Sequence, residues 1–182
     1  MKRRRDYRKF KEILNRYGIT KFYHFTDRSN VASIIANRGL WSWASGKDQN
    51  IIVSRSGGSA LSHSLDSNDG LDKYVRMSVC RNHPMMYQAI SEGRISDPIV
   101  LEIDTDILYI DGNIFSDRNA NRNDAQKGCS FEHFINIHFQ TALCRSQFDV
   151  EESERVYYQA EILVKDYIPL HYILNLLDVN LK

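Results

Sequence analysis

The stretch Val156-Tyr-Tyr-Gln-Ala-Glu-Ile-Leu-Val164 gives the clearest strand signal in this sequence. Its β-branched and aromatic residues favour an extended backbone. Side chains two residues apart lie on the same face of a strand, so we expect Gln159 and Glu161 to share one face. Ala160 and Ile162 then share the opposite, apolar face. The stretch therefore predicts a strand that places a carboxylate beside an amide in a cleft. An exposed edge strand is the alternative.

Strand and helix patterns alternate along the rest of the chain. Short runs of apolar and aromatic residues predict four further strands, at 21–25, 75–80, 99–103 and 107–110. Apolar residues at helical spacing predict four helices, at 6–17, 31–35, 85–90 and 131–138. Polar stretches at 42–73 and 111–128 predict two long loops, of which the first is expected to cover a substrate. This order, without repeat or linker, predicts one mixed α+β domain over residues 1–182.

The composition is that of an ordinary globular protein. Hydrophobic residues make up 42% of the 182 residues and charged residues 26%, which is typical of one domain with a sizeable core. No apolar segment follows the basic residues 2–5, so we expect neither a signal peptide nor a transmembrane helix, and a cytoplasmic protein. The three cysteines are widely separated, and the six histidines show no metal-ligand spacing. We predict no disulfide framework and no metal site.

The first predicted helix is basic on one face. Because the net charge of the chain is only +1, any affinity for nucleic acid must come from such local patches. The residues of this segment that could contact phosphates are Arg3, Arg4, Arg5, Arg8 and Lys11. A solvated charged face is the alternative.

His24 lies among aromatic residues in Phe22-Tyr-His-Phe-Thr26. The flanking rings are expected to hold the imidazole in place. A histidine in such surroundings serves either to bind a ligand or only to support the structure, and its position alone does not separate the two.

Three stretches together resemble the DarT family of DNA ADP-ribosyltransferase toxins. They are Lys21-Phe-Tyr-His-Phe-Thr-Asp-Arg-Ser-Asn30 continuing to Leu40, then Cys80-Arg-Asn-His-Pro-Met-Met-Tyr87, then Gln159-Ala-Glu-Ile-Leu-Val164. The resemblance implies an ADP-ribosyltransferase fold with a split central β-sheet and flanking helices. It also implies that NAD is held in the cleft as co-substrate and that bases in single-stranded DNA are modified. A toxin of this kind is neutralised by a DarG-like macrodomain antitoxin.

The resemblance also assigns roles to residues. It implies that Glu161 is catalytic and that Gln159 orients the acceptor. A carboxylate suits this role because cleavage of the nicotinamide bond leaves positive charge on the ribose, and the carboxylate can also accept the acceptor's proton. The residues implied to bind NAD are His24, Thr26, Tyr87 and Arg76, and those implied to bind the nucleic acid are Asn82, His83 and Arg81.

The target base is predicted from one position at which this sequence departs from the family pattern. The thymine-directed branch of the family carries an arginine just before a Ser-x-Met stretch, where this sequence has Asn82 in Asn82-His-Pro-Met85. This form is closer to the guanine-directed branch, so guanine is favoured over thymine. Arg76 or Arg81 is then expected to supply the positive charge.

Three other functions remain open from the sequence. The first is an ADP-ribosyltransferase that acts on RNA or protein, because acceptor choice depends on loops that one fold can vary. The second is a non-catalytic nucleic-acid-binding module that stacks bases on Trp41 and Trp43. The third is a purely structural or interaction domain.

Overall fold

Two antiparallel sheets organise residues 2–180, the part of the chain that the computed structural model describes. The larger sheet has six strands in the order β4-β1-β3-β7-β5-β6, and the smaller sheet pairs β2 with β8. The strands are β1 (Lys21–Asp27), β2 (Gly39–Trp41), β3 (Tyr74–Ser78), β4 (Pro98–Asp104), β5 (Ile114–Ser116), β6 (Lys127–Gly128), β7 (Glu161–Lys165) and β8 (Tyr167–Pro169).

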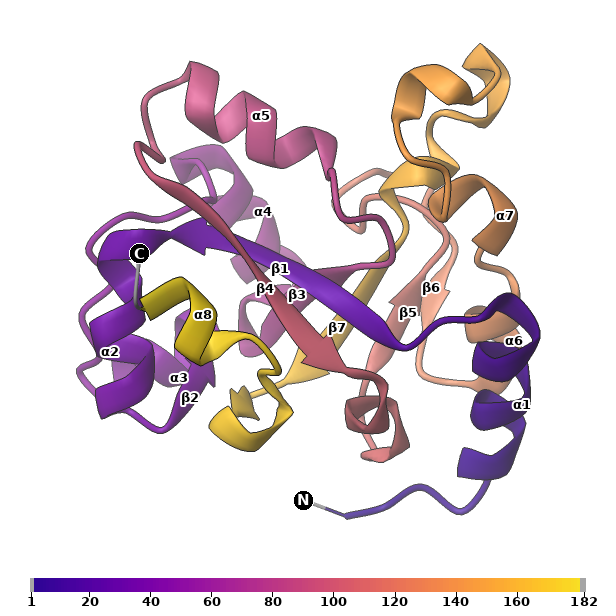
Figure 1. Ribbon diagram of the computed structural model, residues 1–182, viewed down its shortest axis with the longest axis horizontal. Helices are drawn as coiled ribbons and strands as arrows, with labels where there is room; N and C mark the ends of the chain where they lie inside the picture. Colours follow the sequence, from indigo (N-terminus) through magenta and orange to yellow (C-terminus); the bar gives the residue numbers. More distant parts are fainter. Residues whose placement is uncertain (1, 181–182) are drawn as a thin grey trace.

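Helices lie at both ends of the larger sheet. Figure 1 shows α2 and α3 beside β2 at one end, and α1, α6 and α7 at the other. The helices are α1 (Tyr7–Tyr17), α2 (Val31–Ala36), α3 (Trp43–Asp48), α4 (Ala60–Asp69), α5 (Pro84–Ser91), α6 (Phe131–Ile135), α7 (Phe139–Ala142) and α8 (Leu176–Asn180). No helix within residues 2–180 is long and apolar enough to cross a membrane.

Helix α1 confirms the first predicted helix. Phe10, Ile13 and Leu14 are buried and recur on one face, as the apolar spacing requires. Gly18 ends the helix with φ +65°, a left-handed conformation that costs glycine little. The ring of Phe10 packs on Phe115 of β5 with 5.4 Å between centroids, which joins the helix to the sheet.

Arg4 is buried, so the expectation that it could contact phosphates is wrong. Its side chain is only 8% exposed, and its guanidinium lies 3.9 Å from the centroid of the Phe10 ring. Its Nε donates to Asp6 at 2.9 Å and its Nη2 donates to the Cys129 carbonyl at 3.2 Å. Arg4 is therefore a packing residue and is not available to phosphates.

The predicted strand over 156–164 is wrong in its first half. Tyr157–Gln159 form a 3₁₀ helix, and β7 begins only at Glu161. The partners of β7 also end here, because Glu161 lies opposite the terminal residues Ser78 of β3 and Ser116 of β5. Without a neighbouring strand, residues 156–160 cannot form a ladder, and Tyr158 is fully buried instead.

Two other short apolar runs also fold differently from the expectation. Residues 107–109 belong to the 3₁₀ helix Thr105–Tyr109 rather than to a strand, because Asp104 accepts a hydrogen bond from the backbone NH of Asp106 and turns the chain. Ile110 is extended but forms only an isolated bridge with Arg3. The helix predicted over 131–138 stops at Ile135, and His138 precedes the separate helix α7. Periodicity alone does not separate a short strand from a buried turn of helix.

The polar stretches predicted as loops contain regular elements. Residues 42–73 include α3 and α4, each opened by a serine that accepts a backbone NH: Ser42 from Ser45, and Ser59 from Ser62. Residues 111–128 include β5 and β6. The first stretch covers a cleft, as expected, but does so with helices.

Candidate active site

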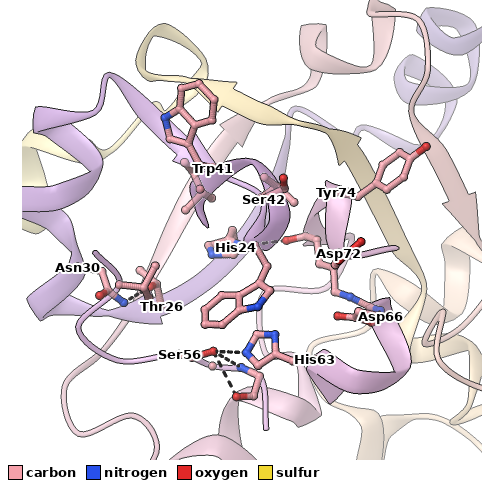
Figure 2. A pocket seen from close by; sticks show the side chains of 18 of the residues that line it. His24, Thr26, Asn30, Trp41, Ser42, Ser56, His63, Asp66, Asp72 and Tyr74 are labelled. Carbon is pink, nitrogen blue, oxygen red and sulfur yellow. Dashed lines mark hydrogen bonds and ion pairs between the residues drawn. The ribbon is translucent and has the colours of Figure 1, made fainter. Parts of the chain in front are cut away.

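A cleft of about 320 Å³ opens between the larger sheet and the helices of residues 42–73. Its floor comes from β1 and β3, its cover from α3, α4 and the segment 51–58, and its far wall from Glu161, Asn119 and Asn121. Figure 2 shows His24 and Thr26 on one side of the cleft and His63 and Asp66 on the other. The long polar stretch therefore folds back over the sheet residues predicted to be functional.

Glu161 lies at the start of β7 and is 5% exposed. Its Oε2 accepts two hydrogen bonds, from Arg76 Nη1 at 2.6 Å and from the backbone NH of Ala120 at 2.8 Å. These two donors fix the position of the carboxylate. Within residues 2–180 no donor binds Oε1, so this second oxygen is left for a ligand in the cleft.

Arg76 connects three parts of the site. Besides Glu161 it binds Asp66 of α4 and, at 2.6 Å, Asn121 Oδ1 in the segment between β5 and β6. Burial acts to lower the pKa of Arg76, but the charges of Glu161 and Asp66 outweigh burial and raise it. The guanidinium is therefore a permanent cation that orients the carboxylate of Glu161 and ties α4 to the sheet.

His24 projects from β1 into the cleft, and its tautomer follows from its partner. Its Nδ1 lies 2.7 Å from the carbonyl oxygen of Arg76, and because a carbonyl only accepts, Nδ1 must carry the proton. Nε2 is then an unprotonated acceptor. Burial lowers the pKa of His24, with the bond to Arg76 opposing it in part, so the imidazole stays neutral at neutral pH.

Asn30 fastens the cover of the cleft to β1. Its Nδ2 donates to Thr26 Oγ1 at 3.0 Å and to the Arg55 carbonyl at 2.7 Å, and its Oδ1 accepts from the backbone NH of Ser54 at 2.8 Å. Thr26, predicted to bind NAD, lines the cleft, and its hydroxyl accepts the hydrogen bond from Asn30. Asn30 lies in the first stretch that resembles the family. Because an asparagine just before a helix is ordinarily a helix cap, its position did not suggest a role in the cleft.

An aromatic pair crosses the cover. The rings of Trp43 and His63 stack with 4.0 Å between centroids and 20° between planes. His63 Nε2 lies 2.7 Å from Ser56 Oγ, and burial lowers the pKa of His63. The pair joins α3 to α4. Sequence reasoning considered Trp43 for stacking bases but missed His63, because no motif links the two.

Several predicted site residues lie outside the cleft. Tyr87 is 54% exposed on α5, and Gln159 sits in the 3₁₀ helix before β7; neither lines the cleft. Arg81 points outward and pairs with Glu102 of β4 at 3.2 Å. Asn82 donates to the Arg145 carbonyl at 3.0 Å. The expected pairing of Gln159 with Glu161 on one strand face is therefore wrong.

His83 is buried beside the cleft rather than in it. It precedes α5, and its Nδ1 accepts the backbone NH of Met85 at 3.3 Å. Its ring lies parallel to that of Phe25, which lines the cleft. Burial lowers the pKa of His83, and the negative charge of Glu161 opposes this shift. Of the Asn82-His-Pro-Met85 stretch, only Met85 reaches the cleft wall.

Comparisons with known proteins identify a family and a fold. Residues 23–177 match the family model described as "ssDNA thymidine ADP-ribosyltransferase, DarT". No curated protein sequence gives a significant match.

Solved structures share the fold. DarT of Thermus sp. 2.9 in complex with ADP-ribosylated ssDNA aligns with a TM-score of 0.69 at 20% identity, over 85% of this chain and 78% of that one. The same protein in complex with NAD+ gives 0.64 at 20% identity, over 85% and 79%. Thermosipho africanus DarTG in complex with ADP-ribose gives 0.69 at 19% identity, over 90% of this chain and 48% of that one. The predicted α+β ADP-ribosyltransferase fold is confirmed.

Proposed function

The chain belongs to the DarT family of single-stranded-DNA ADP-ribosyltransferases, and on this basis we propose that it is a toxin that transfers ADP-ribose from NAD to a DNA base. The observation that carries the proposal is the environment of Glu161. Its carboxylate is held by Arg76 and the Ala120 backbone, with Oε1 left for the cleft. A fixed negative charge of this kind stabilises a cationic ribose.

The residues of the cleft fit a dinucleotide. The volume of the cleft, about 320 Å³, lies at the lower end of the range for ordinary ligand pockets. Lys47 and Arg55 line it and, within residues 2–180, form no ion pair with a carboxylate, so they can meet a pyrophosphate. His24 Nε2 offers an acceptor for a ribose hydroxyl. The structures of Thermus sp. 2.9 DarT in complex with NAD+ and carba-NAD+ are consistent with this assignment.

The reaction exchanges one bond at ribose C1′ for another and moves one proton. The bond from ribose C1′ to the nicotinamide nitrogen breaks, and its electron pair leaves with nicotinamide. A nucleophilic atom of the base then bonds to C1′ and gives up its proton, which Glu161 is positioned to accept. Throughout, Arg76 keeps the Glu161 carboxylate oriented.

Guanine is the proposed target base. Its support is the Asn82-His-Pro-Met85 stretch, which lacks the arginine of the thymine-directed branch. The family description names thymidine, so thymine is the second candidate. Arg81, one of the two arginines considered as a replacement, is engaged with Glu102, whereas Arg76 is already in the cleft.

We also propose a partner and a location. Thermosipho africanus DarTG is a related protein of greater length, and a DarG-like macrodomain is the antitoxin expected to neutralise this chain. Action on DNA is consistent with a cytoplasmic enzyme.

The test is incubation with labelled NAD and separate pools of single-stranded DNA, matched duplex, RNA and protein. We expect label on single-stranded DNA and less on duplex, because unpairing a base costs a few kcal/mol. Oligonucleotides that contain a single guanine or a single thymine then identify the base by mass. Label on RNA or protein alone would contradict the proposal, and DNA binding without NAD consumption would favour the binding module.

A further inference from the structure

The indole of Trp43 already lies against a cation. Lys47, one turn further along α3, places its Nζ 4.9 Å from the centroid of the Trp43 ring. An indole face is the strongest side-chain partner for a cation, through the negative charge density of its π system. Trp43, Lys47 and His63 all line the cleft.

The stack of Trp43 on His63 is a built feature of the cover. His63 is held by Ser56, and Gly58 makes room for its ring: a Cβ at Gly58 would lie 3.0 Å from the imidazole. The Ser56 hydroxyl also accepts the backbone NH of Gly58 at 3.2 Å. Ser56 and the space at Gly58 therefore fix the imidazole of His63, on which the indole of Trp43 stacks.

The stack lies close to the proposed reaction centre. His63 and Asp66 are three residues apart on α4, so their side chains are neighbours on one face of the helix. Asp66 binds Arg76, and Arg76 binds Glu161. Figure 2 shows His63 and Asp66 side by side at the cleft. NAD has two bases, adenine and nicotinamide. Nicotinamide is attached to the ribose on which Glu161 is proposed to act, so it is the base expected near His63 and Trp43.

We propose that Trp43 is a specificity residue that binds the nicotinamide ring of NAD+ by a cation–π contact and so selects the oxidised dinucleotide over NADH. The proposal rests on the proposed use of NAD. The nicotinamide of NAD+ is a planar cation, whereas that of NADH is neutral, so the indole attracts only the first electrostatically. In the free protein Lys47 takes the place of this cation. The product nicotinamide is neutral, so cleavage also weakens its hold.

Trp41 provides a matched control. It is the other tryptophan of the chain, two residues away, but its ring stacks on Tyr167 with 4.5 Å between centroids, and its Nε1 donates to the Asn37 carbonyl. Figure 2 shows Trp41 on the opposite side of His24 from His63. Its replacement removes an indole without removing the proposed cation site.

The test measures the affinities of NAD+ and NADH by calorimetry, in a Glu161→Gln background so that NAD+ is not consumed. For Trp43→Leu we expect the preference for NAD+ over NADH to fall roughly three- to tenfold, the size of a cation–indole contact. Trp43→Phe, which keeps a weaker aromatic face, should give an intermediate ratio and covers the case that the leucine variant does not fold. Trp41→Leu should leave the ratio unchanged. In a Trp41→Phe protein, where Trp43 is the sole indole, NAD+ should quench tryptophan fluorescence.

Equal losses of NAD+ and NADH affinity in the Trp43 variants, or an unchanged ratio, would overturn the specificity role while leaving the transferase function intact. Failure of the parent protein to bind NAD+ at all would instead overturn the proposed function.

Discussion

Arg76 and Glu161 form a diagonal ion pair across β3 and β7, with 2.6 Å between Nη1 and Oε2. Glu161 lies opposite Ser78, and Arg76 projects from the same face of β3 two residues before Ser78. Asp66 of α4 binds the other side of the guanidinium. One arginine thus orients the proposed catalytic carboxylate and anchors the helix that covers it.

Replacement of Arg76 by Met should destabilise the protein by about 3 kcal/mol, because it leaves two largely buried carboxylates, Glu161 and Asp66, without their cation. Urea denaturation measures the loss. Asp66→Asn in the Arg76→Met background should cost much less than Asp66→Asn alone, because the ion pair is already gone. If the losses of unfolding free energy for Arg76→Met and Asp66→Asn simply added in the double variant, the pair would contribute no coupling. Arg76→Lys, which keeps the charge but not the forked geometry, should recover part of the stability and little activity.

NAD+ affinity should depend on the protonation of His24. With Nδ1–H bound to the Arg76 carbonyl, Nε2 accepts a hydrogen bond only while the ring is neutral. Burial lowers the pKa of His24 from its ordinary 6.5, so affinity should be constant between about pH 7 and 8 and should fall only in more acid solution. Calorimetry on the Glu161→Gln protein measures this. With His24→Asn added, this protein should bind weakly at every pH, and a loss of affinity already above pH 6.5 while His24 is present would refute the neutral acceptor.

Asp27 should make the fold sensitive to acid. Burial acts to raise its pKa, but hydrogen bonds from Asp97, Ser29 and Ser96 outweigh burial and hold the pKa of Asp27 well below its ordinary 3.8. A depressed pKa stabilises the folded state above the unfolded pKa, and this stabilisation is lost as pH falls below about 3.8. Asp27→Asn should therefore cost about 3 kcal/mol at pH 7 and clearly less at pH 3. Equal costs at both pH values would contradict the linkage.

The exposed cations of the N-terminal segment should set the salt dependence of DNA binding. Arg4 is buried, and Arg3 is exposed but packs closely on Tyr7, 3.8 Å from the ring centroid, so the residues chosen for replacement are the exposed Arg5, Arg8 and Lys11. Their joint replacement by Gln should flatten the slope of log affinity against log salt by about 0.7 for each lost phosphate contact. NAD hydrolysis without DNA should not change, and neither should the target base, since phosphate contacts do not read sequence.

Lys165→Gln serves as the control for these substitutions, since Lys165 is exposed at the opposite end of β7 from Glu161. An unchanged slope in the triple variant would mean that α1 is only a solvated face.

The sequence predicted the long, strongly patterned elements well. The spacing of apolar residues with Gly18 predicts α1, and the apolar run 99–103 predicts β4. It did not predict the turn at 157–159, because β-propensity describes a residue's fit to a sheet and no strand is available there as a partner. Nor did it predict α3 and α4, whose polar composition resembles a loop although Ser42 and Ser59 are ordinary helix caps.

Two of the candidate site residues could be found in the stretches that resemble the family. Glu161 and His24 lie in two of these stretches, and both line the cleft. Arg76, which also lines it, lies in none of them. Tyr87 and Gln159 do not line the cleft, because the register of a helix and the start of a strand decide where such side chains point. Contacts such as Trp43 with His63 depend on how distant segments pack, and no spacing in the sequence encodes them.

The role of Glu161 is tested most directly by mass spectrometry of a single-stranded oligonucleotide incubated with NAD and either the parent protein or Glu161→Gln. The parent protein should add ADP-ribose to one base and release nicotinamide. The variant keeps the size of the side chain and an oxygen that can accept from Arg76 or Ala120, so it should fold while losing the charge that faces the ribose. We expect its rate to fall at least about a hundredfold. A folded Glu161→Gln protein that modifies the oligonucleotide at close to the parent rate would contradict the account.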